Sequence, residues 1–442
     1  MYNKYENGGI KMEDKTYLCI DLKTFYASVE CVERGLDPFT TKLVVADPDR
    51  ESTTICLAIS PRMKELGVHN RCRLFEIPKD ISYIMAKPRM KKYIEYSANI
   101  YAIYLKYISK EDIYVYSIDE CFMDVTSYLN MYQISAFDLA KRIIDDVYKT
   151  YGITATAGIG TNLFLTKIAM DIDAKHRKDN LGYLDIEEFK KRIWHHKPIT
   201  DIWQIGLGTA KRLEKYNVYD LYGVAHMDKA ILYKEFGVNA EVLIDHANGI
   251  EPTTIKEIKE YIPESNSISS NQILGSGYTF KDARLAFSEL VEMSILDLVD
   301  RGVVCCGISF GVTYREVHEK WSDALNPYKR FMPSMQSLRL DEYVNSYKIL
   351  YPYFMEMFDK NVDRSGIIRS IAIGFYGIKD ESYKTIDLFM DEEELKKEEK
   401  LSHTILDLKK KYGKNSILKA QDLEESAIAK ERNSMIGGHN SE

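Results

Sequence analysis

YLCIDL at residues 17–22 and YSIDECFMD at residues 116–124 are the two stretches that decide the fold. The first is an apolar run with Asp21 next to its end, which predicts a buried strand. The second belongs to a pair of predicted strands, at residues 113–117 and 121–125, joined by a tight connection at Asp119 and Glu120. The sequence therefore predicts a sheet with acidic residues where its strands end.

The elements around these stretches predict how the sheet is built. Thr24 is placed as the N-cap of a helix at residues 25–34, and Gly35 as its stop. Further elements are expected as helices at 89–108, 137–151 and 163–173, a strand at 154–158, and, in an insertion at about 38–87, strands near 43–46 and 53–59 and a helix at 61–66. Without the insertion, the order strand, helix, strand, strand, helix, strand is that of the ferredoxin-like split βαβ arrangement. Such a sheet carries two helices on one face and leaves the other open to a ligand.

The second half of the chain predicts further domains, so the fold class is α+β and multidomain. Short helices with glycine turns are expected at about 181–249. Strands return at 273–279, 303–314 and 367–376, with an amphipathic helix at 282–301. From residue 391 the sequence is rich in Glu and Lys, which predicts a solvated helix or a flexible tail.

Length and composition narrow the class of protein. The 442 residues are too many for a single core, and 45% hydrophobic with 29% charged residues is an ordinary soluble composition. We expect neither membrane insertion nor export, because no apolar stretch is long enough and the start of the chain is polar. The seven cysteines include no Cys-x-x-Cys, which predicts reduced, buried thiols. The net charge of −7 argues mildly against nucleic-acid binding, although local patches matter more than the sum.

Asp21, Asp119 and Glu120 are the candidate catalytic residues. In a split βαβ sheet the end of the first strand lies beside the hairpin, so the three carboxylates are expected to converge. Carboxylates that share a site need cations, and ligands that are all oxygen favour Mg²⁺ or Mn²⁺. Two such ions activate a hydroxyl and stabilise a pyrophosphate leaving group. Taken singly, Asp21 also fits a helix cap and Asp119-Glu120 a polar turn; their joint placement favours the metal site.

Several motifs together carry a family resemblance. The segment from Asp21 to Glu30 (DLKTFYASVE) resembles the first motif of Y-family DNA polymerases, and Tyr116 to Asp124 resembles their Ser-Ile-Asp-Glu motif. Gly158-Ile-Gly-Thr-Asn162, followed by Lys167-Ile-Ala169, is similar to their third palm motif. The resemblance covers nearly the whole chain after Lys15, in the family's order, and is closest to the UmuC-like branch of Gram-positive bacteria and their mobile elements.

The resemblance implies a right-hand polymerase with four domains. The palm would be ferredoxin-like and span residues 16–37 and 88–180, with small fingers at 38–87. A helical thumb with a helix-hairpin-helix would span 181–255, an αβ little finger 265–387 and a charged tail 388–442, after a disordered leader at 1–15. The implied activity is low-fidelity translesion synthesis in the response to DNA damage. A monomer in the bacterial cytoplasm, close to the nucleoid, would use primer–template DNA, dNTPs and two Mg²⁺ or Mn²⁺ ions.

Carried over by position, the resemblance assigns the active site. Asp21, Asp119 and Glu120 would be the metal ligands, joined by the Leu22 carbonyl oxygen. Tyr26 would be the steric gate that meets a 2′-hydroxyl, with Phe25 beside the nucleotide; ordinary core aromatics are the other interpretation of this pair. The triphosphate would be bound by Lys167 and by a basic residue of the fingers. Where a Tyr-x-x-Arg is expected, the chain has Ser60-Pro-Arg-Met-Lys64, so Arg62 and Lys64 are both candidates.

The DNA and a sliding clamp are the implied macromolecular partners. The segment from Ile202 to Leu213 resembles a helix-hairpin-helix, in which Gly206, Gly208, Thr209 and Lys211 would hold a DNA phosphate. In the little finger, Ser269, Ser270, Lys281 and Arg284 are template-phosphate candidates. Thr385-Ile-Asp-Leu-Phe389 resembles the clamp-binding pentapeptide, with Leu388 and Phe389 as anchors and Thr385 where Gln is usual. A last core strand is the competing interpretation. Residues 431–439 are a further stretch that is common in this branch, and no role is assigned to them.

Two other functions fit part of the pattern. A nucleotidyl cyclase would share the palm and its metals, but would need neither the helix-hairpin-helix nor the strand-rich domain. A catalytically inactive member of the family that binds DNA and the clamp would be expected to have lost a carboxylate, and all three are present.

Overall fold

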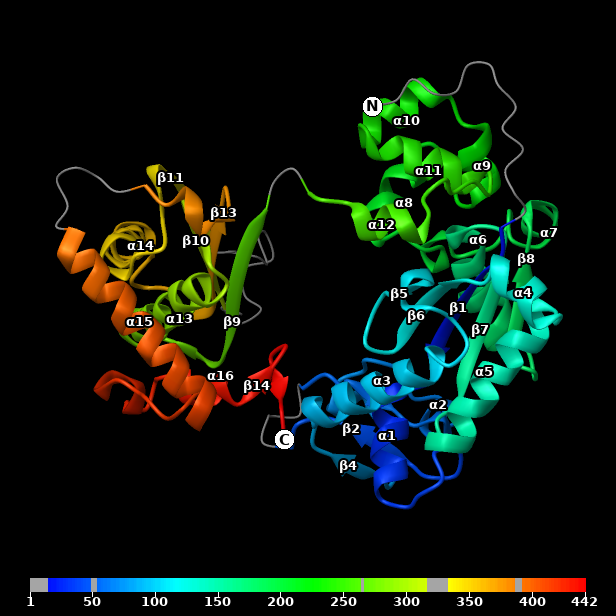
Figure 1. Cartoon of the computed structure of the whole chain (residues 1–442), viewed down its shortest axis with the longest axis horizontal. Coiled ribbons are helices and arrows are strands. Elements are labelled where there is room, and N and C mark those ends of the chain that lie inside the picture. Colours follow the sequence, from blue (N-terminus) through cyan, green and yellow to red (C-terminus); the bar gives the residue numbers. More distant parts are fainter. Residues whose placement is uncertain (1–14, 49–53, 264–265, 316–332, 386–391) are drawn as a thin grey trace, which may run out of the picture. The chain divides into compact units, whose positions relative to one another are not determined.

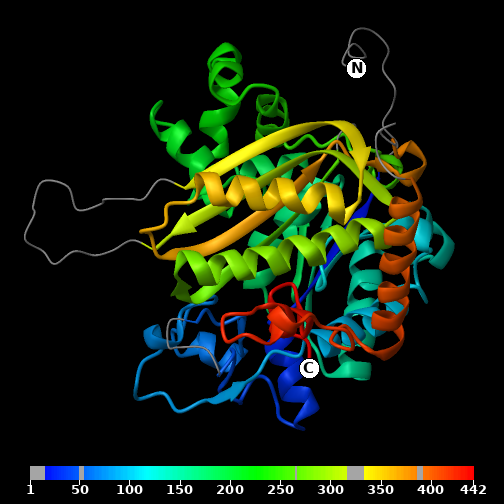
Figure 2. The same ribbon diagram turned by 90° about the vertical axis from the view of Figure 1, so that its left-hand side faces the viewer.

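The computed structural model describes residues 15–48, 54–263, 266–315, 333–385 and 392–442. The chain divides into two compact units, Met1–Tyr261 with Glu442, and Ile262–Ser441, and each is described by itself (Figures 1 and 2). The expected leader lies outside the described residues except for Lys15. In the described ranges, every helix is too short or too polar to cross a bilayer.

A five-stranded sheet forms the centre of the first unit, in the order β5-β6-β1-β7-β8. Its strands are β1 (Tyr17–Leu22), β5 (Ile113–Val115), β6 (Glu120–Asp124), β7 (Ala155–Gly160) and β8 (Leu181–Leu184). β1 is antiparallel to both β6 and β7, so the first four strands have the predicted ferredoxin-like order. β8 differs from the prediction: residues expected to belong to a purely helical region pair in parallel with β7 and extend the sheet.

The helices of this sheet domain follow the predictions closely. They are α1 (Phe25–Glu33), α3 (Met90–Tyr104), α4 (Thr126–Tyr132), α5 (Ala136–Tyr151) and α6 (Leu163–Ile168). α4 was not predicted. Glycine lets α6 and the π-helical turn after it lie directly on β7, because a Cβ on Gly158 would be 2.2 Å from the Thr166 carbonyl oxygen. α6 begins near Tyr17 and runs back along β7, so this packing brings the residues after α6 to the end of the sheet that carries Asp21.

α1 begins at the predicted residue but by a different mechanism. Thr24 has a left-handed backbone conformation, with φ 47°, and makes no side-chain cap hydrogen bond. Its hydroxyl instead lies 3.0 Å from the Ser28 hydroxyl. Gly35 has φ +66° and ends the helix as predicted. The left-handed turn directs the chain from Asp21 into the helix that carries Tyr26.

The insertion forms a small domain with its own core. It consists of β2 (Leu43–Val45), β3 (Ala58–Ile59), β4 (Ile84–Ala86) and α2 (Pro61–Glu65), with strand order β3-β2-β4. The strand expected at 53–59 is shorter, and Ile55 forms only an isolated bridge with Arg73. Val44, Ile59 and Met63 are buried at the centre of this domain.

The remainder of the first unit is helical. Its helices are α7 (Ile186–Arg192), α8 (Leu207–Glu214), α9 (Leu221–His226), α10 (Lys229–Phe236), α11 (Asn239–Ala247) and α12 (Ile255–Glu260). Their core includes Phe189, Leu213 and Leu232 and is continuous with Phe164 of α6. The helical region is therefore joined to the sheet domain by packing as well as by the chain.

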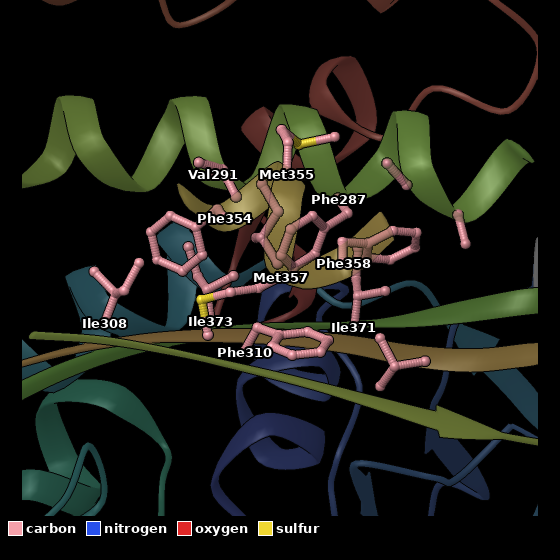
Figure 3. Close-up of a cluster of buried hydrophobic side chains, with 14 of the residues drawn as sticks. Phe287, Val291, Ile308, Phe310, Phe354, Met355, Met357, Phe358, Ile371 and Ile373 are labelled. Atoms are coloured by element: carbon pink, nitrogen blue, oxygen red, sulfur yellow. The ribbon is translucent and has the colours of Figure 1, made fainter. Parts of the chain in front are cut away.

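The second unit is a four-stranded antiparallel sheet with helices on one face. The order is β11-β10-β12-β9, from β9 (Ser267–Tyr278), β10 (Val303–Tyr314), β11 (Ser334–Val344) and β12 (Ile368–Tyr376), and a short β13 (Lys379–Asp380) pairs with β10. α13 (Phe280–Asp300) and α14 (Tyr347–Asn361) pack on this sheet. Figure 3 shows Phe287 and Phe358 above Phe310 in the core between helices and sheet. β11 was not predicted.

The C-terminal segment contains the helix predicted from residue 391, and most residues of that helix are exposed, but the segment packs against α13, so the alternative of a flexible tail is wrong. Its elements are α15 (Glu392–Tyr412), α16 (Ala429–Asn433) and a hairpin of β14 (Met435–Ile436) and β15 (His439–Asn440). α15 and α16 both contact α13, and Ile428 is 5% exposed in the core. Apolar Ile428 and polar contacts, such as the hydrogen bond from the Ser346 hydroxyl to Glu398 of α15, attach the segment. All seven cysteines are free and six are buried, as predicted.

Candidate active site

The pairing of β1 with β6 brings the three predicted acidic positions together. Asp21 lies directly opposite Glu120 in the register, and the Leu22 amide donates to the Asp119 carbonyl oxygen at 2.9 Å. Ser97 of α3 donates to the Ile118 carbonyl oxygen at 2.5 Å and holds the connection between the strands. The backbone convergence inferred from the sequence is therefore present.

The three carboxylates themselves point to different partners. Asp119 accepts from the Ser117 hydroxyl at 2.6 Å, and Glu120 lies 2.5 Å from the Lys167 ammonium. Asp21 is 3.2 Å from the Lys175 ammonium. Across the described ranges, three acidic, His or Cys side chains are nowhere arranged together as a set of metal ligands. The ammonium groups of Lys167 and Lys175 lie next to Glu120 and Asp21.

The chemistry of the donor set nevertheless fits a hard divalent cation. Burial, with the nearby charges of Asp119 and Glu120, raises the pKa of Asp21 to about 6, against the opposing charge of Lys175. A bound cation would relieve this repulsion between carboxylates. Cys19 donates its thiol proton to Glu120 at 3.2 Å, and burial raises its pKa well above the ordinary value, so it stays a thiol. The available donors are thus carboxylate oxygens, which Mg²⁺ and Mn²⁺ prefer.

Lys167, the predicted triphosphate ligand of the palm, lies buried beside Glu120. Its side chain is 8% exposed and makes ion pairs with Glu120 at 2.5 Å and Asp171 at 2.8 Å. Although burial disfavours the charge, Cys19, Asp171 and Glu120 raise the pKa of Lys167. A buried ammonium held by two carboxylates is suited to orienting Glu120 and has little freedom to reach an incoming ligand.

Lys23, Lys64 and Lys175 form a group of cations near Asp21, which we call the lysine group. Lys175 is 41% exposed and pairs with Asp21 and with Asp171, at 3.2 and 2.8 Å. Partial burial lowers the pKa of Lys23 and of Lys64, and repulsion by Lys175 adds to this effect, while the attraction of Asp21 opposes it. Neighbouring cations that repel one another favour the binding of an additional anion.

Sequence reasoning did not select Lys23 or Lys175. Lys23 stands inside the first motif, directly after β1, where its closeness to Asp21 was the available signal. Lys175 stands in a 3₁₀ turn after α6 and becomes adjacent to Asp21 only through the packing of α6 on β7. The sequence gives no separate signal for that approach.

The structure separates the two fingers candidates. Arg62 lies 2.9 Å from Glu65 in the next turn and is 42% exposed, so its charge is already paired on the surface. Lys64 instead interacts electrostatically with Lys175 and Asp21. Lys64 is thus the residue of α2 whose charge interacts with that of Asp21.

Tyr26 lies between the acidic site and the helices behind it. Phe25 is 3% exposed and belongs to the core, whereas Tyr26 is partly exposed. Burial and the charge of Asp119 raise the pKa of the Tyr26 phenol. Phe25 thus faces the core, whereas the Tyr26 hydroxyl interacts electrostatically with Asp119.

The turn before α8 leaves its backbone open. Gly206 is the N-cap of α8, and a Cβ added to Gly206 or Gly208 would meet nothing within 4 Å. Packing within the chain therefore does not require glycine at either position. Lys211 is exposed, whereas Arg212 donates to the Glu235 carbonyl oxygen at 2.8 Å and lies over Phe236. Thr209 is partly exposed in the first turn of α8.

Of the residues of the second unit predicted to contact template phosphates, two are exposed and two bind other side chains of the protein. Ser269 is exposed on β9, whereas Ser270 lies on the face of Ile268 and Leu274 and accepts from Arg432 at 2.7 Å. Lys281 is exposed. Arg284 forms two hydrogen bonds to Asp359, at 2.7 and 2.8 Å, and so joins α13 to α14. Ser270 and Arg284 have structural partners inside the chain.

The predicted clamp anchors Leu388 and Phe389 lie outside the described residues. Thr385, at the start of that peptide, is tied to β11: its amide donates to the Tyr343 carbonyl oxygen at 3.0 Å, and its hydroxyl accepts from the Tyr343 amide at 2.7 Å. The residue that stands in place of Gln is thus an extension of the sheet edge.

Comparisons with known proteins agree on one family. Residues 20–171 match the impB/mucB/samB family. A putative UV-damage repair protein UvrX of Bacillus subtilis (strain 168) is 28% identical over 97% of this chain and 98% of its own length. DNA polymerase IV 2 of the same strain is 27% identical over 97% and 99%. Among solved structures, a Y-family DNA polymerase chimera of Dbh and Dpo4 segments has a TM-score of 0.59 at 18% identity, covering 82% of this chain and 99% of that one.

Proposed function

We propose that this chain, which belongs to the impB/mucB/samB family and has the fold of Y-family DNA polymerases, is a template-directed DNA polymerase that performs translesion synthesis. The observation that carries the proposal is the register of β1 with β6, which sets Asp21 opposite Glu120 with Asp119 next to it. The names of its relatives, DNA polymerase IV 2 and UV-damage repair protein UvrX, support the same reaction. The reaction transfers the nucleotidyl group of a dNTP to a primer 3′-hydroxyl: the new bond forms at the α-phosphate, and pyrophosphate leaves.

Asp21, Asp119 and Glu120, with the Leu22 carbonyl oxygen, would hold the divalent ions. Two such ions supply activation of the 3′-hydroxyl and charge stabilisation of the pyrophosphate. In the chain itself, Lys167 orients Glu120 through their ion pair at 2.5 Å, and the Ser117 hydroxyl orients Asp119. We assign Lys167 to this positioning role.

The lysine group would bind the triphosphate. Lys64 approaches the acidic site from α2, Lys23 from the end of β1 and Lys175 from the turn after α6. An ammonium beside a phosphate forms a charge-assisted hydrogen bond, and a triphosphate offers several oxygens for such bonds. This group also supplies cations where the fingers lack the usual Tyr-x-x-Arg pattern.

Tyr26 would select the sugar. A ring placed against C2′ of the incoming nucleotide leaves no room for a ribonucleotide hydroxyl. The position of the phenol near Asp119, with the neighbouring Phe25 buried in the core, supports this assignment.

The helical region and the second unit would hold the DNA. The open backbone at Gly206 and Gly208 allows a phosphate to approach the start of α8, and exposed Lys211 adds charge. On the second unit, exposed Ser269 and Lys281 would contact template phosphates, whereas Ser270 and Arg284 bind Arg432 and Asp359 instead. Gly206→Ala should fold normally and weaken primer–template binding in a fluorescence anisotropy titration.

Recruitment and location complete the proposal. Leu388 and Phe389 would enter a pocket of a sliding clamp, which would raise the local concentration of the polymerase at the primer end. We place the protein in the bacterial cytoplasm, because its substrate would be the chromosome.

Primer extension with Mg²⁺ tests the function. Asp119→Ala and Glu120→Ala should each abolish nucleotide addition and leave primer–template affinity unchanged. Asp124→Asn is the matched control, since Asp124 lies on the same strand but contacts Thr126 and Lys15. Retention of near-normal extension by either alanine variant would refute the polymerase assignment. Formation of a cyclic nucleotide from a nucleoside triphosphate without DNA would favour a cyclase.

A further inference from the structure

The ring of Tyr26 is stacked on the ring of Tyr93. The ring centroids are 4.5 Å apart and the planes differ by 19°. Tyr26 stands in the first turn of α1 and Tyr93 in the first turn of α3, and the two helices pack together. Tyr93 is therefore a flat surface directly behind the Tyr26 side chain.

Tyr93 is itself fixed by a buried ionic network. Its side chain is fully buried, and its hydroxyl donates to Glu30 Oε1 at 2.8 Å. Glu30 is also fully buried and accepts from Arg89 at 3.0 and 2.9 Å and from Arg34. A carboxylate with both oxygens engaged by guanidinium groups holds its partners in one geometry.

A gate residue needs such support. Discrimination against a 2′-hydroxyl depends on a ring that does not yield by a fraction of an ångström when a larger sugar arrives. Tyr26 is only partly buried, so its own surroundings leave space for movement. The stack against Tyr93 closes one direction, and the tilted ring of Phe25, 5.8 Å away between centroids, lies on another side.

We propose that Tyr93 is a positioning residue for sugar discrimination, which it sets by holding the Tyr26 ring in place from the buried Glu30–Arg89 network. The inference rests on the proposed role of Tyr26 as the gate. Tyr93 does not touch the nucleotide; it acts through Tyr26. A residue that only filled the core would lower stability and would slow deoxynucleotide and ribonucleotide addition equally.

The test measures single-nucleotide addition of dATP and of ATP opposite template dT, with the full chain, primer–template and Mg²⁺. Tyr93→Leu removes the ring, and Tyr93→Met is a second ring-less variant for which the longer, adaptable side chain preserves packing. Both should lower the ratio of kcat/KM for dATP over ATP about fivefold or more, through a gain with ATP, and keep kcat/KM for dATP within about twofold. Tyr93→Phe keeps the stack and should retain most of the discrimination.

Tyr96 provides the matched control. It lies three residues further along α3, makes the corresponding hydrogen bond to Glu33 at 2.7 Å, and contacts Tyr151 rather than Tyr26. Tyr96→Leu should leave the dATP/ATP ratio unchanged.

The outcomes separate the two assignments. Unchanged discrimination in Tyr26→Ala would refute the gate itself. Lost discrimination in Tyr26→Ala, with wild-type discrimination in folded Tyr93→Leu or Tyr93→Met, would refute the role of Tyr93. In the Tyr26→Ala background, Tyr93→Leu should cause no further loss; an additional loss there would show that Tyr93 acts by another route and would also overturn the proposal.

Discussion

Glu289→Gln is expected to strengthen the attachment of the C-terminal segment above neutral pH. Glu289 stands on α13, is 1% exposed, and accepts the Ile428 amide at 2.6 Å with Oε2. Its other oxygen, Oε1, has no hydrogen-bond partner in the described structure. Burial and the charge of Asp422 raise the pKa of Glu289 to about 7, against the amides of Ile428 and Ala429. The folded protein therefore stabilises the protonated form of the Glu289 carboxyl group relative to the ionised form.

The size and sign of the effect follow from the two pKa values. The folded state binds the proton more tightly than the unfolded state, whose ordinary value is 4.5. The contribution to stability is therefore complete below pH 4.5, is lost as the pH rises to about 7, and stays lost at higher pH. The difference between the two values corresponds to roughly 3 kcal/mol as an upper limit. The glutamine side chain in the Glu289→Gln variant would be neutral at every pH and would offer an N–H toward Asp422.

The assay is urea denaturation at pH 5 and pH 8, monitored by circular dichroism. Hydrogen exchange of the Ile428 amide reports separately on the attachment of the C-terminal segment. Glu289→Gln should match the wild type at pH 5 and exceed it by roughly 1 to 3 kcal/mol at pH 8. Glu356→Gln is the control, because Glu356 is exposed on α14, and it should show no such dependence. A stability difference between Glu289→Gln and the wild type that is the same at both pH values would refute the reasoning.

Three further predictions address the active site, the sheet and recruitment. Lys175→Ala should lower kcat/KM for dNTP by about tenfold or more through KM, whereas Arg62→Ala should change it less than about twofold; equal losses would contradict the lysine group. Gly158→Ala should cost about 3 kcal/mol or more in urea denaturation, because the new methyl meets the Thr166 carbonyl oxygen, and a wild-type midpoint would contradict this packing. Leu388→Ala with Phe389→Ala should keep unassisted extension and lose stimulation by a loaded clamp; full stimulation would contradict the clamp proposal.

The first unit was predictable because its sheet and its motifs give the same answer. The apolar run before Asp21 and the hairpin at Asp119 set two antiparallel neighbours, and the order of elements allowed one sheet topology for the four predicted strands. β8 was missed because Leu181–Leu184 contains a glycine and is only four residues long. Its identity as a strand depends on the neighbouring edge of β7, which lies elsewhere in the sequence.

The site was predictable for the backbone and only in part for the side chains. A motif fixes where Glu120 stands, but the partner of its carboxylate depends on which lysine the packing of α6 brings close. For this reason Lys167, which follows a motif, turned out buried, and Lys175, which follows none, turned out to face Asp21. The docking of the C-terminal segment was not predicted, because its composition is polar and its attachment depends on contacts with α13 and α14, which lie elsewhere in the sequence.

The negative net charge and the expected polyanionic substrates are reconciled by where the charges lie. The formal charge of −7 is a sum over 442 residues, whereas electrostatic attraction at 0.15 M salt reaches only about 8 Å. Around Asp21 the structure gathers lysines whose charges repel one another, and many acidic residues elsewhere are already paired, as Asp359 is with Arg284. A triphosphate or a bound divalent ion would thus meet a local balance of charge very different from the total. The net charge of the whole chain is therefore a poor predictor of its ligands, whereas the arrangement of charged residues around β1 indicates an anion and a divalent cation.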